Sequence, residues 1–91
     1  MSIKELSEMS GRVYVHFANA EQGLDFLRQA EQEGFTFADG AKPTSRHCAD
    51  IISINKDETI NYVGINGRIA YYGGAKQIEN EKLIRIEYNS S

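Results

Sequence analysis

The sequence predicts one α+β domain, in which a single main helix packs on a sheet of five or six largely antiparallel strands. Three patterns support this fold class. Apolar and polar residues alternate over residues 12–17, and again in segments between residues 51 and 88, which is the period of a strand. Over residues 20–33, apolar residues instead recur on one arc of a helix. The predicted order is strand, helix and then four strands, after a short N-terminal arm.

The length of 91 residues predicts that residues 1–91 form one domain with a small core. The ten basic and thirteen acidic residues are interspersed and give a net charge of −3. Because no basic block could follow a phosphate backbone, we expect no sequence-specific binding of nucleic acid. No apolar run approaches the ~20 residues of a membrane span, and the N-terminus lacks a signal-peptide core. With a single cysteine, Cys48, the composition favours a reducing, cytoplasmic location and no membrane partner.

Residues 1–11 are predicted to form the arm. Ile3, Leu6 and Met9 recur at every third position, which suits one or two helical turns, and Gly11 ends them. A helical segment this short is not stable alone, so it either docks on the domain or frays. The strand that follows is RVYVHF.

The main helix has clear boundaries. Asn19 is a favourable N-cap, Gln22 completes a capping box three residues later, and Gly34 permits a left-handed stop. The apolar arc covers about 160° and consists of Ala20, Gly23, Leu24, Phe26, Leu27 and Ala30. Glu31 points into this arc, where we expect it to reach solvent or meet a cation.

The second half of the chain is predicted to be mostly strands. The short strand FTF leads into a loop, ADGAKPTSRHCAD, whose turn residues are typical of a connector, although loops of this length are often functional. DIISINKDETINYV predicts a hairpin, and GINGRIAYYGG predicts another with a type I′ turn at Asn66-Gly67. GGAKQIENE is expected to be a loop or helical turn before the last strand, KLIRIEY. The sheet face away from the helix is expected to be polar or solvated, and its candidates are Tyr14, His16, Ser53, Asn61, Tyr71 and Arg85.

The reactive side chains do not form a recognisable catalytic or metal-binding pattern. Cys48 adjoins His47, but neighbouring residues on an extended chain point in opposite directions, so a small buried thiol is the simpler interpretation. Neither these residues nor His16 and Asp50 have the paired spacing of a zinc site. The glycine-containing segments match no phosphate-binding fingerprint. We therefore expect no catalytic residue, no metal and no cofactor.

The candidate binding residues are Lys42, Arg46, Arg68 and Tyr72. Exposed tyrosine beside arginine is typical of the residues that dominate protein interfaces. The alternative is that all four are ordinary surface residues. KLIRIEY is also a candidate edge strand, which would allow a homodimer to form by strand pairing, although its charged residues would oppose such pairing.

Gly34, Phe35, Phe37, Gly40 and the segment Lys42–Thr44 carry a family resemblance over about Phe17 to Tyr62. With its EGF-x-F and DG-x-KPT segments, the chain resembles small accessory proteins of phages and mobile elements of Gram-positive bacteria. Those proteins often have tryptophan where Phe37 stands here. The resemblance implies no chemistry; it implies a setting in which some proteins of this size block host defence by binding.

Three functions follow as hypotheses. The first is a non-enzymatic binding protein that occludes a host protein, such as an anti-CRISPR-type inhibitor of a defence nuclease. The alternative is a sponge or sensor for a small molecule or nucleotide, with Lys42, Arg46 and Arg68 meeting the anion. The least favoured is a small hydrolase that uses Cys48, because so small a core leaves little room for a reaction pocket.

Overall fold

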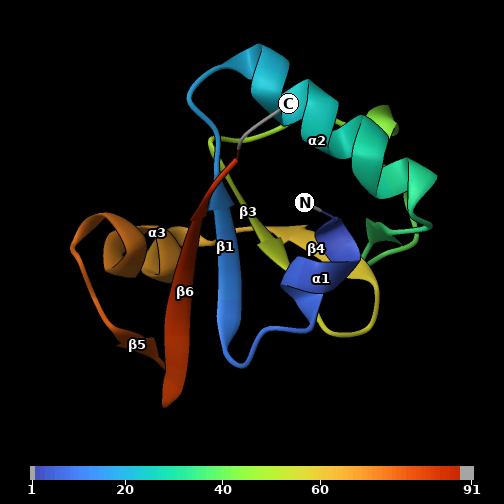
Figure 1. The fold of residues 1–91 in the computed structure, drawn as a ribbon. Coiled ribbons are helices and arrows are strands. Elements are labelled where there is room, and N and C mark those ends of the chain that lie inside the picture. The colour runs from blue at the N-terminus through green and yellow to red at the C-terminus, as the bar shows by residue number, and fades with distance from the viewer. Residues whose placement is uncertain (1, 89–91) are drawn as a thin grey trace.

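Six strands form one mixed sheet in the computed structural model, which describes residues 2–88 (Figure 1). The α+β class is therefore correct, with three α-helices among the described residues. In chain order, the elements are α1 (Ile3–Ser7), β1 (Arg12–His16), α2 (Ala20–Gln32), β2 (Thr36–Phe37), the 3₁₀ turn η1 (Pro43–Ser45), β3 (Ile51–Ile54), β4 (Thr59–Tyr62), α3 (Ile65–Tyr72), β5 (Gln77–Ile78) and β6 (Glu81–Glu87).

The strand order is β2-β4-β3-β1-β6-β5. Strand β1 is central and pairs antiparallel with β3 and parallel with β6. The other parallel pair is β2 with β4, whereas β3–β4 and β5–β6 are antiparallel. The predicted, largely antiparallel sheet is thus only roughly right, because the sheet is mixed.

Helix α2 begins and ends where its caps predict. The Asn19 side chain accepts a hydrogen bond from the Gln22 amide, and the Gln22 side chain accepts one from Ala18, each at 2.9 Å. Gly34 then takes the left-handed conformation, with φ +86°. The inner face of α2 lies on the sheet and buries Gly23, Phe26, Leu27 and Ala30.

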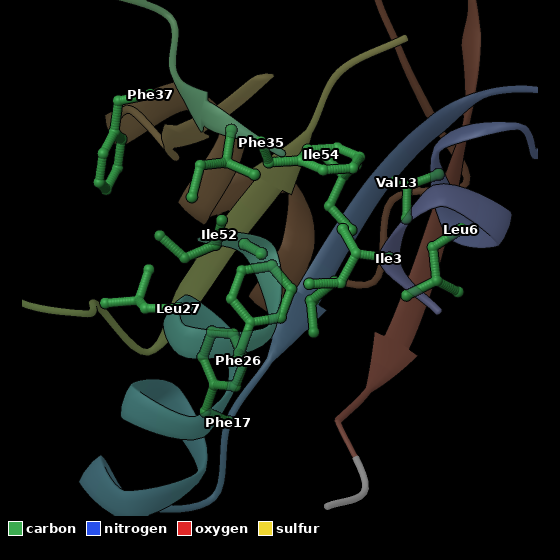
Figure 2. Packing of buried hydrophobic residues seen from close by; sticks show 13 residues of the cluster. Ile3, Leu6, Val13, Phe17, Phe26, Leu27, Phe35, Phe37, Ile52 and Ile54 are labelled. Atoms are coloured by element: carbon green, nitrogen blue, oxygen red, sulfur yellow. The ribbon is translucent and has the colours of Figure 1, made fainter. Parts of the chain in front are cut away.

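The N-terminal arm is docked on the same side of the sheet. Ile3 and Leu6 are 1% and 5% exposed, and they point into the cluster formed by Phe26 and its neighbours (Figure 2). The Glu33 carboxylate, at the end of α2, accepts hydrogen bonds from the amides of Ile3 and Lys4 at 3.0 and 2.9 Å. One side chain therefore ties α1 to α2.

A third helix, α3, covers part of the opposite sheet face, where we predicted a strand hairpin. A second buried cluster of Tyr14, Ile51 and Leu83 lies there, with Tyr71 of α3 packed against it. Gly67 is not a turn residue: a Cβ there would lie 2.7 Å from Val63 Cγ1 and 2.9 Å from Tyr14 Oη. The glycine is needed because α3 approaches the sheet closely.

The type I′ turn occurs elsewhere in the chain. Glu79 and Asn80 link β5 to β6 and have φ values of +51° and +68°, as both central residues of such a turn require. The segment predicted to be a loop or helical turn thus contains a strand and a tight hairpin. Within residues 2–88, no helix has the length and apolar character needed to cross a membrane.

Candidate protein-binding surface

Helix α3 is the element with the most exposed apolar side chains. None of its residues is buried, whereas α2 buries four. Ile65, Ile69 and Tyr72 are 76%, 68% and 55% exposed. Their spacing of four and three residues aligns them on one side of the helix. We call these three residues the α3 stripe.

The inner side of α3 is held against the sheet by aromatic rings. The ring of Tyr71 stacks on those of Tyr14 and His16, with centroids 6.4 and 6.1 Å apart. From β6, the Arg85 guanidinium donates to the carbonyl oxygens of Tyr71 at 3.0 Å and Ala70 at 3.3 Å. These carbonyl oxygens lie at the C-terminal end of the helix, where a cation is favourable.

The outer side of α3 is anchored by Asp50, which precedes β3. Arg68 donates to the two carboxylate oxygens at 2.6 and 2.8 Å, and the Tyr72 hydroxyl donates to one of them at 2.5 Å. The hydrogen bonds from Arg68 hold the pKa of Asp50 well below its usual range. The same carboxylate raises the pKa of the Tyr72 hydroxyl. The structure therefore brings two of the four predicted binding residues together, through an acid that we had not singled out for binding.

The other two predicted binding residues lie on the connector between β2 and β3. Arg46 donates to Asp39 at 2.5 Å, and its guanidinium lies 4.8 Å from the centre of the Phe37 ring. Lys42 is exposed at the start of the turn η1. The connector pair thus has its own set of contacts, separate from those of Arg68 and Tyr72.

The connector is fixed to α2 by its 3₁₀ turn. Pro43 is buried, and the Glu31 carboxylate accepts hydrogen bonds from the Thr44 hydroxyl at 2.7 Å and the Thr44 amide at 3.2 Å. We expected Glu31 to reach solvent or meet a cation. It is exposed to solvent, and its carboxylate also accepts from a hydroxyl and an amide. These hydrogen bonds lower the pKa of Glu31.

Cys48 is half-buried beside α2. A Cβ added to Gly23 would lie 2.8 Å from the Cys48 sulfur, so the thiol packs directly on that helix. Burial, with a smaller effect of Asp50, raises the pKa of the thiol to about 12. A nucleophilic cysteine needs the thiolate form, which this environment disfavours at neutral pH.

An open groove of about 590 Å³ lies at the end of the sheet, between the N-terminal turn and the start of β6. Three cations line it, namely Arg12, Lys56 and Lys82. Arg12 bonds Glu79 and Glu81, at 2.8 and 3.3 Å. Lys56 donates to the backbone oxygen of Met9. Two of the three cations are therefore already engaged within the chain.

The sequence contained a signal for the α3 stripe that we had not used. Ile65, Ile69 and Tyr72 recur at helical spacing, and Gly64 precedes them as the N-cap. Asp50 gave no such signal, because its partner Arg68 lies 18 positions away in the sequence. No protein-family model matches the chain, and no curated protein and no solved structure is significantly similar to it.

Proposed function

We propose that this protein is a non-enzymatic binding protein that docks on a protein partner through the α3 stripe. The observation that carries the proposal is the exposure of three large apolar side chains, Ile65, Ile69 and Tyr72, on one side of a short helix. Exposed apolar residues scattered singly are ordinary on a protein surface, whereas an aligned set is typical of an interaction site.

The mode of binding that fits is a helix face in an apolar groove. Anchors at positions i, i+4 and i+7 are the pattern with which helices enter such grooves. From Ile65 to Tyr72, the stripe is about 10 Å long, at ~1.5 Å per residue. Tyr72 at its end combines a large ring with a hydroxyl, as interface hot spots often do.

The contacts of Asp50 support the proposal, because they hold the Tyr72 side chain in place before a partner binds. Its carboxylate holds both the hydroxyl of Tyr72 and the guanidinium of Arg68. A side chain that is already ordered loses less entropy when it is buried at an interface. Arg68 serves in this account as a positioning residue and a polar rim for the stripe.

We propose further that the partner is a host protein which the chain occludes, in the manner of an anti-CRISPR-type inhibitor of a defence nuclease. The support for this setting is the resemblance to phage and mobile-element accessory proteins over about Phe17 to Tyr62. The α3 stripe supplies the apolar contact that a blocking protein needs.

The test compares proteins captured from a host lysate by matched variants. Ile65→Glu and Ile69→Glu place a charge on the stripe, and Leu24→Glu places one on an exposed apolar site of α2, where Leu24 is 41% exposed. The proposal expects a specific protein to be retained by the unchanged chain and by the Leu24 variant, and to be lost with both stripe variants. If the unchanged chain and all three variants retained the same host protein equally well, the α3 stripe would not be the binding site.

The second candidate is the nucleotide sponge or sensor, which the groove at the end of the sheet favours. Arg46 and Arg68 are neutralised by Asp39 and Asp50, and Arg12 by Glu79 and Glu81, so an anion in the groove would meet Lys82 instead. ATP, with inorganic phosphate as the control anion, should then raise the melting temperature, and Lys82→Ala should abolish that rise. A melting temperature that neither anion moves would eliminate this candidate.

A further inference from the structure

Strand β6 has an outer edge that is only partly paired. On one side it lies along β1, and on the other it pairs with the two residues of β5 (Figure 1). That second pairing ends at Lys82. Among the residues that the structure describes, no strand lies beside the outer edge of β6 beyond this point.

The hydrogen bonds of two residues fix which backbone groups face outward. The Leu83 amide donates to Lys76 on the β5 side at 2.9 Å, and the Tyr88 amide donates to His16 of the β1 strand at 3.0 Å. Because backbone groups alternate in direction along a strand, the odd-numbered residues face outward. The N–H and C=O groups of Arg85 and Glu87 therefore point away from β1, and no strand within residues 2–88 lies there to bond them.

We propose that a second copy of this chain pairs with this edge, antiparallel, with Arg85 of each copy opposite Glu87 of the other. In this antiparallel register, Arg85 and Glu87 of one copy both lie opposite an outward-facing residue of the other copy. A register shifted by two residues would leave one of the two without such a partner. The unshifted register makes four backbone hydrogen bonds around a two-fold axis at Ile86. Unpaired strand edges are ready templates for such pairing.

The side chains around this axis are self-complementary, as a two-fold interface requires. On the α3 face, the register places the Arg85 guanidinium beside the Glu87 carboxylate of the other copy, twice. On the α2 face, Ile86 meets its own copy, and Ile84 lies opposite Tyr88. Ile84, Ile86 and Tyr88 are all half-buried in the single chain, so pairing would cover apolar surface that is now partly exposed.

The groups that the pairing needs are partly engaged within the chain but keep further capacity. Arg85 donates through Nε and Nη2 to carbonyl oxygens of α3, and a guanidinium has five N–H donors in all. On the β5 side, the last hydrogen bond to β6 is that of the Leu83 amide with Lys76, three positions before Ile86, which leaves the backbone groups of Arg85 and Glu87 outside that pairing. Glu87 already contacts His16 at 2.8 Å, but its side chain is 64% exposed. A carboxylate has two oxygens and accepts from more than one donor, so a further contact with Arg85 is feasible.

Cysteine cross-linking tests the register. In a Cys48→Ala background, Ile86→Cys should form a disulfide-linked dimer, because the two Cα atoms of a facing pair lie about 4.5 Å apart, within disulfide reach. Ile84→Cys is the matched control: its two copies would be about 14 Å apart, at ~3.4 Å per residue, and should stay uncross-linked. Equal cross-linking at both positions would refute the register.

A charge exchange tests the proposal without cysteines. Glu87→Arg alone would set Arg85 against arginine, and Arg85→Glu alone would set glutamate against Glu87, so each should weaken the dimer about ten-fold or more. Mixing the two variants should restore dimers, since every cross-strand pair is then of opposite charge. Circular dichroism of each variant checks that it is folded.

Sedimentation of the unchanged chain decides whether the pairing occurs. The proposal expects reversible dimers, and an unchanged chain that stays monomeric up to about 1 mM would overturn it. Ile65→Glu on the α3 stripe should leave the dimer intact. Failure of this inference and failure of the proposed function are therefore separate outcomes.

Discussion

Arg68 and Asp50 join helix α3 to the start of β3 through two hydrogen bonds between a guanidinium and a carboxylate, 2.6 and 2.8 Å long. The pair adds to the contacts of Tyr71 and Arg85 on the inner side of α3. The Tyr72 hydroxyl shares the same carboxylate at 2.5 Å. On its outer side, α3 is thus tied to the sheet through one acidic side chain outside the helix.

Asp50→Ala should lower the free energy of unfolding by about 1–2 kcal/mol, because it removes two charge-assisted hydrogen bonds and a third from tyrosine. Hydrogen exchange should become faster at the amides of α3. The matched control is Asp39→Ala, which breaks the exposed pair with Arg46 and a hydrogen bond from the Ala41 amide and should cost less than Asp50→Ala. Equal losses in the two variants, measured by urea unfolding, would contradict the anchoring role.

The contribution of Asp50 should depend on pH in a defined direction. Its pKa in the folded protein is lowered, so the stability it provides is complete above the unfolded pKa of about 3.9. It is lost as the pH falls through the lower, folded pKa. Well above the unfolded pKa of about 3.9, Asp50 is ionised in both the folded and the unfolded state. We therefore expect the difference in unfolding free energy between the unchanged chain and Asp50→Asn to be constant from about pH 5 to about pH 7. It should shrink below about pH 4, and a difference that grows on acidification would contradict this sign.

The N-terminal arm should behave as part of the core. Ile3 is 1% exposed, so Ile3→Ala should destabilise the protein by about 2–4 kcal/mol through lost burial and a cavity. Met9, just after α1, is 39% exposed, and Met9→Ala should change stability by no more than about 0.5 kcal/mol. Urea unfolding of both variants makes the comparison, and an Ile3 variant as stable as the Met9 variant would mean that the arm is not docked.

Gly23 should be intolerant of even a methyl group. A Cβ there would lie 2.8 Å from both Cβ and Sγ of Cys48. Gly23→Ala should therefore cost about 1–3 kcal/mol by overpacking, against the gain of ~1 kcal/mol that alanine usually brings inside a helix. Gly64 has open space around it, so Gly64→Ala should cost only the difference between glycine and alanine as an N-cap, less than about 1 kcal/mol, in the same thermal and urea measurements.

Cys48 should react slowly with iodoacetamide. Its pKa is raised to about 12 and it is half-buried, so we expect alkylation of the folded protein at pH 8 to be at least ~100-fold slower than in urea. Mass spectrometry of timed samples measures both rates. Comparable rates in the two states would revive the cysteine-dependent hydrolase, the least favoured of the three hypotheses.

The sequence predicted best what depends on neighbouring residues. The boundaries of α2 follow from Asn19, Gln22 and Gly34, which cap the helix locally, and they were right. At α3 the prediction of a hairpin was wrong, because it relied on the turn signal of Asn66-Gly67. The helical spacing of Ile65, Ile69 and Tyr72 was not used. Gly67 is there because a sheet side chain comes close, and such a contact is not visible in a local pattern.

The candidate site was predictable only in part, for the same reason. Arg68 and Tyr72 could be named from residue type and turn out to share one partner. Lys42 and Arg46 were named on equal grounds but lie on the connector, where Arg46 is paired with Asp39. Composition indicates which side chains suit an interface, whereas the pairing of Asp50 with Arg68 is set by the tertiary fold.

The parallel contact between β1 and β6 has a consequence for biosynthesis. It brings together His16 and Glu87, which are 71 positions apart. During synthesis the central strand therefore lacks one of its two neighbours until β6 has also left the ribosome. Contacts of such long sequence separation also slow folding, so the β1–β6 pairing should be among the last contacts of the sheet to form.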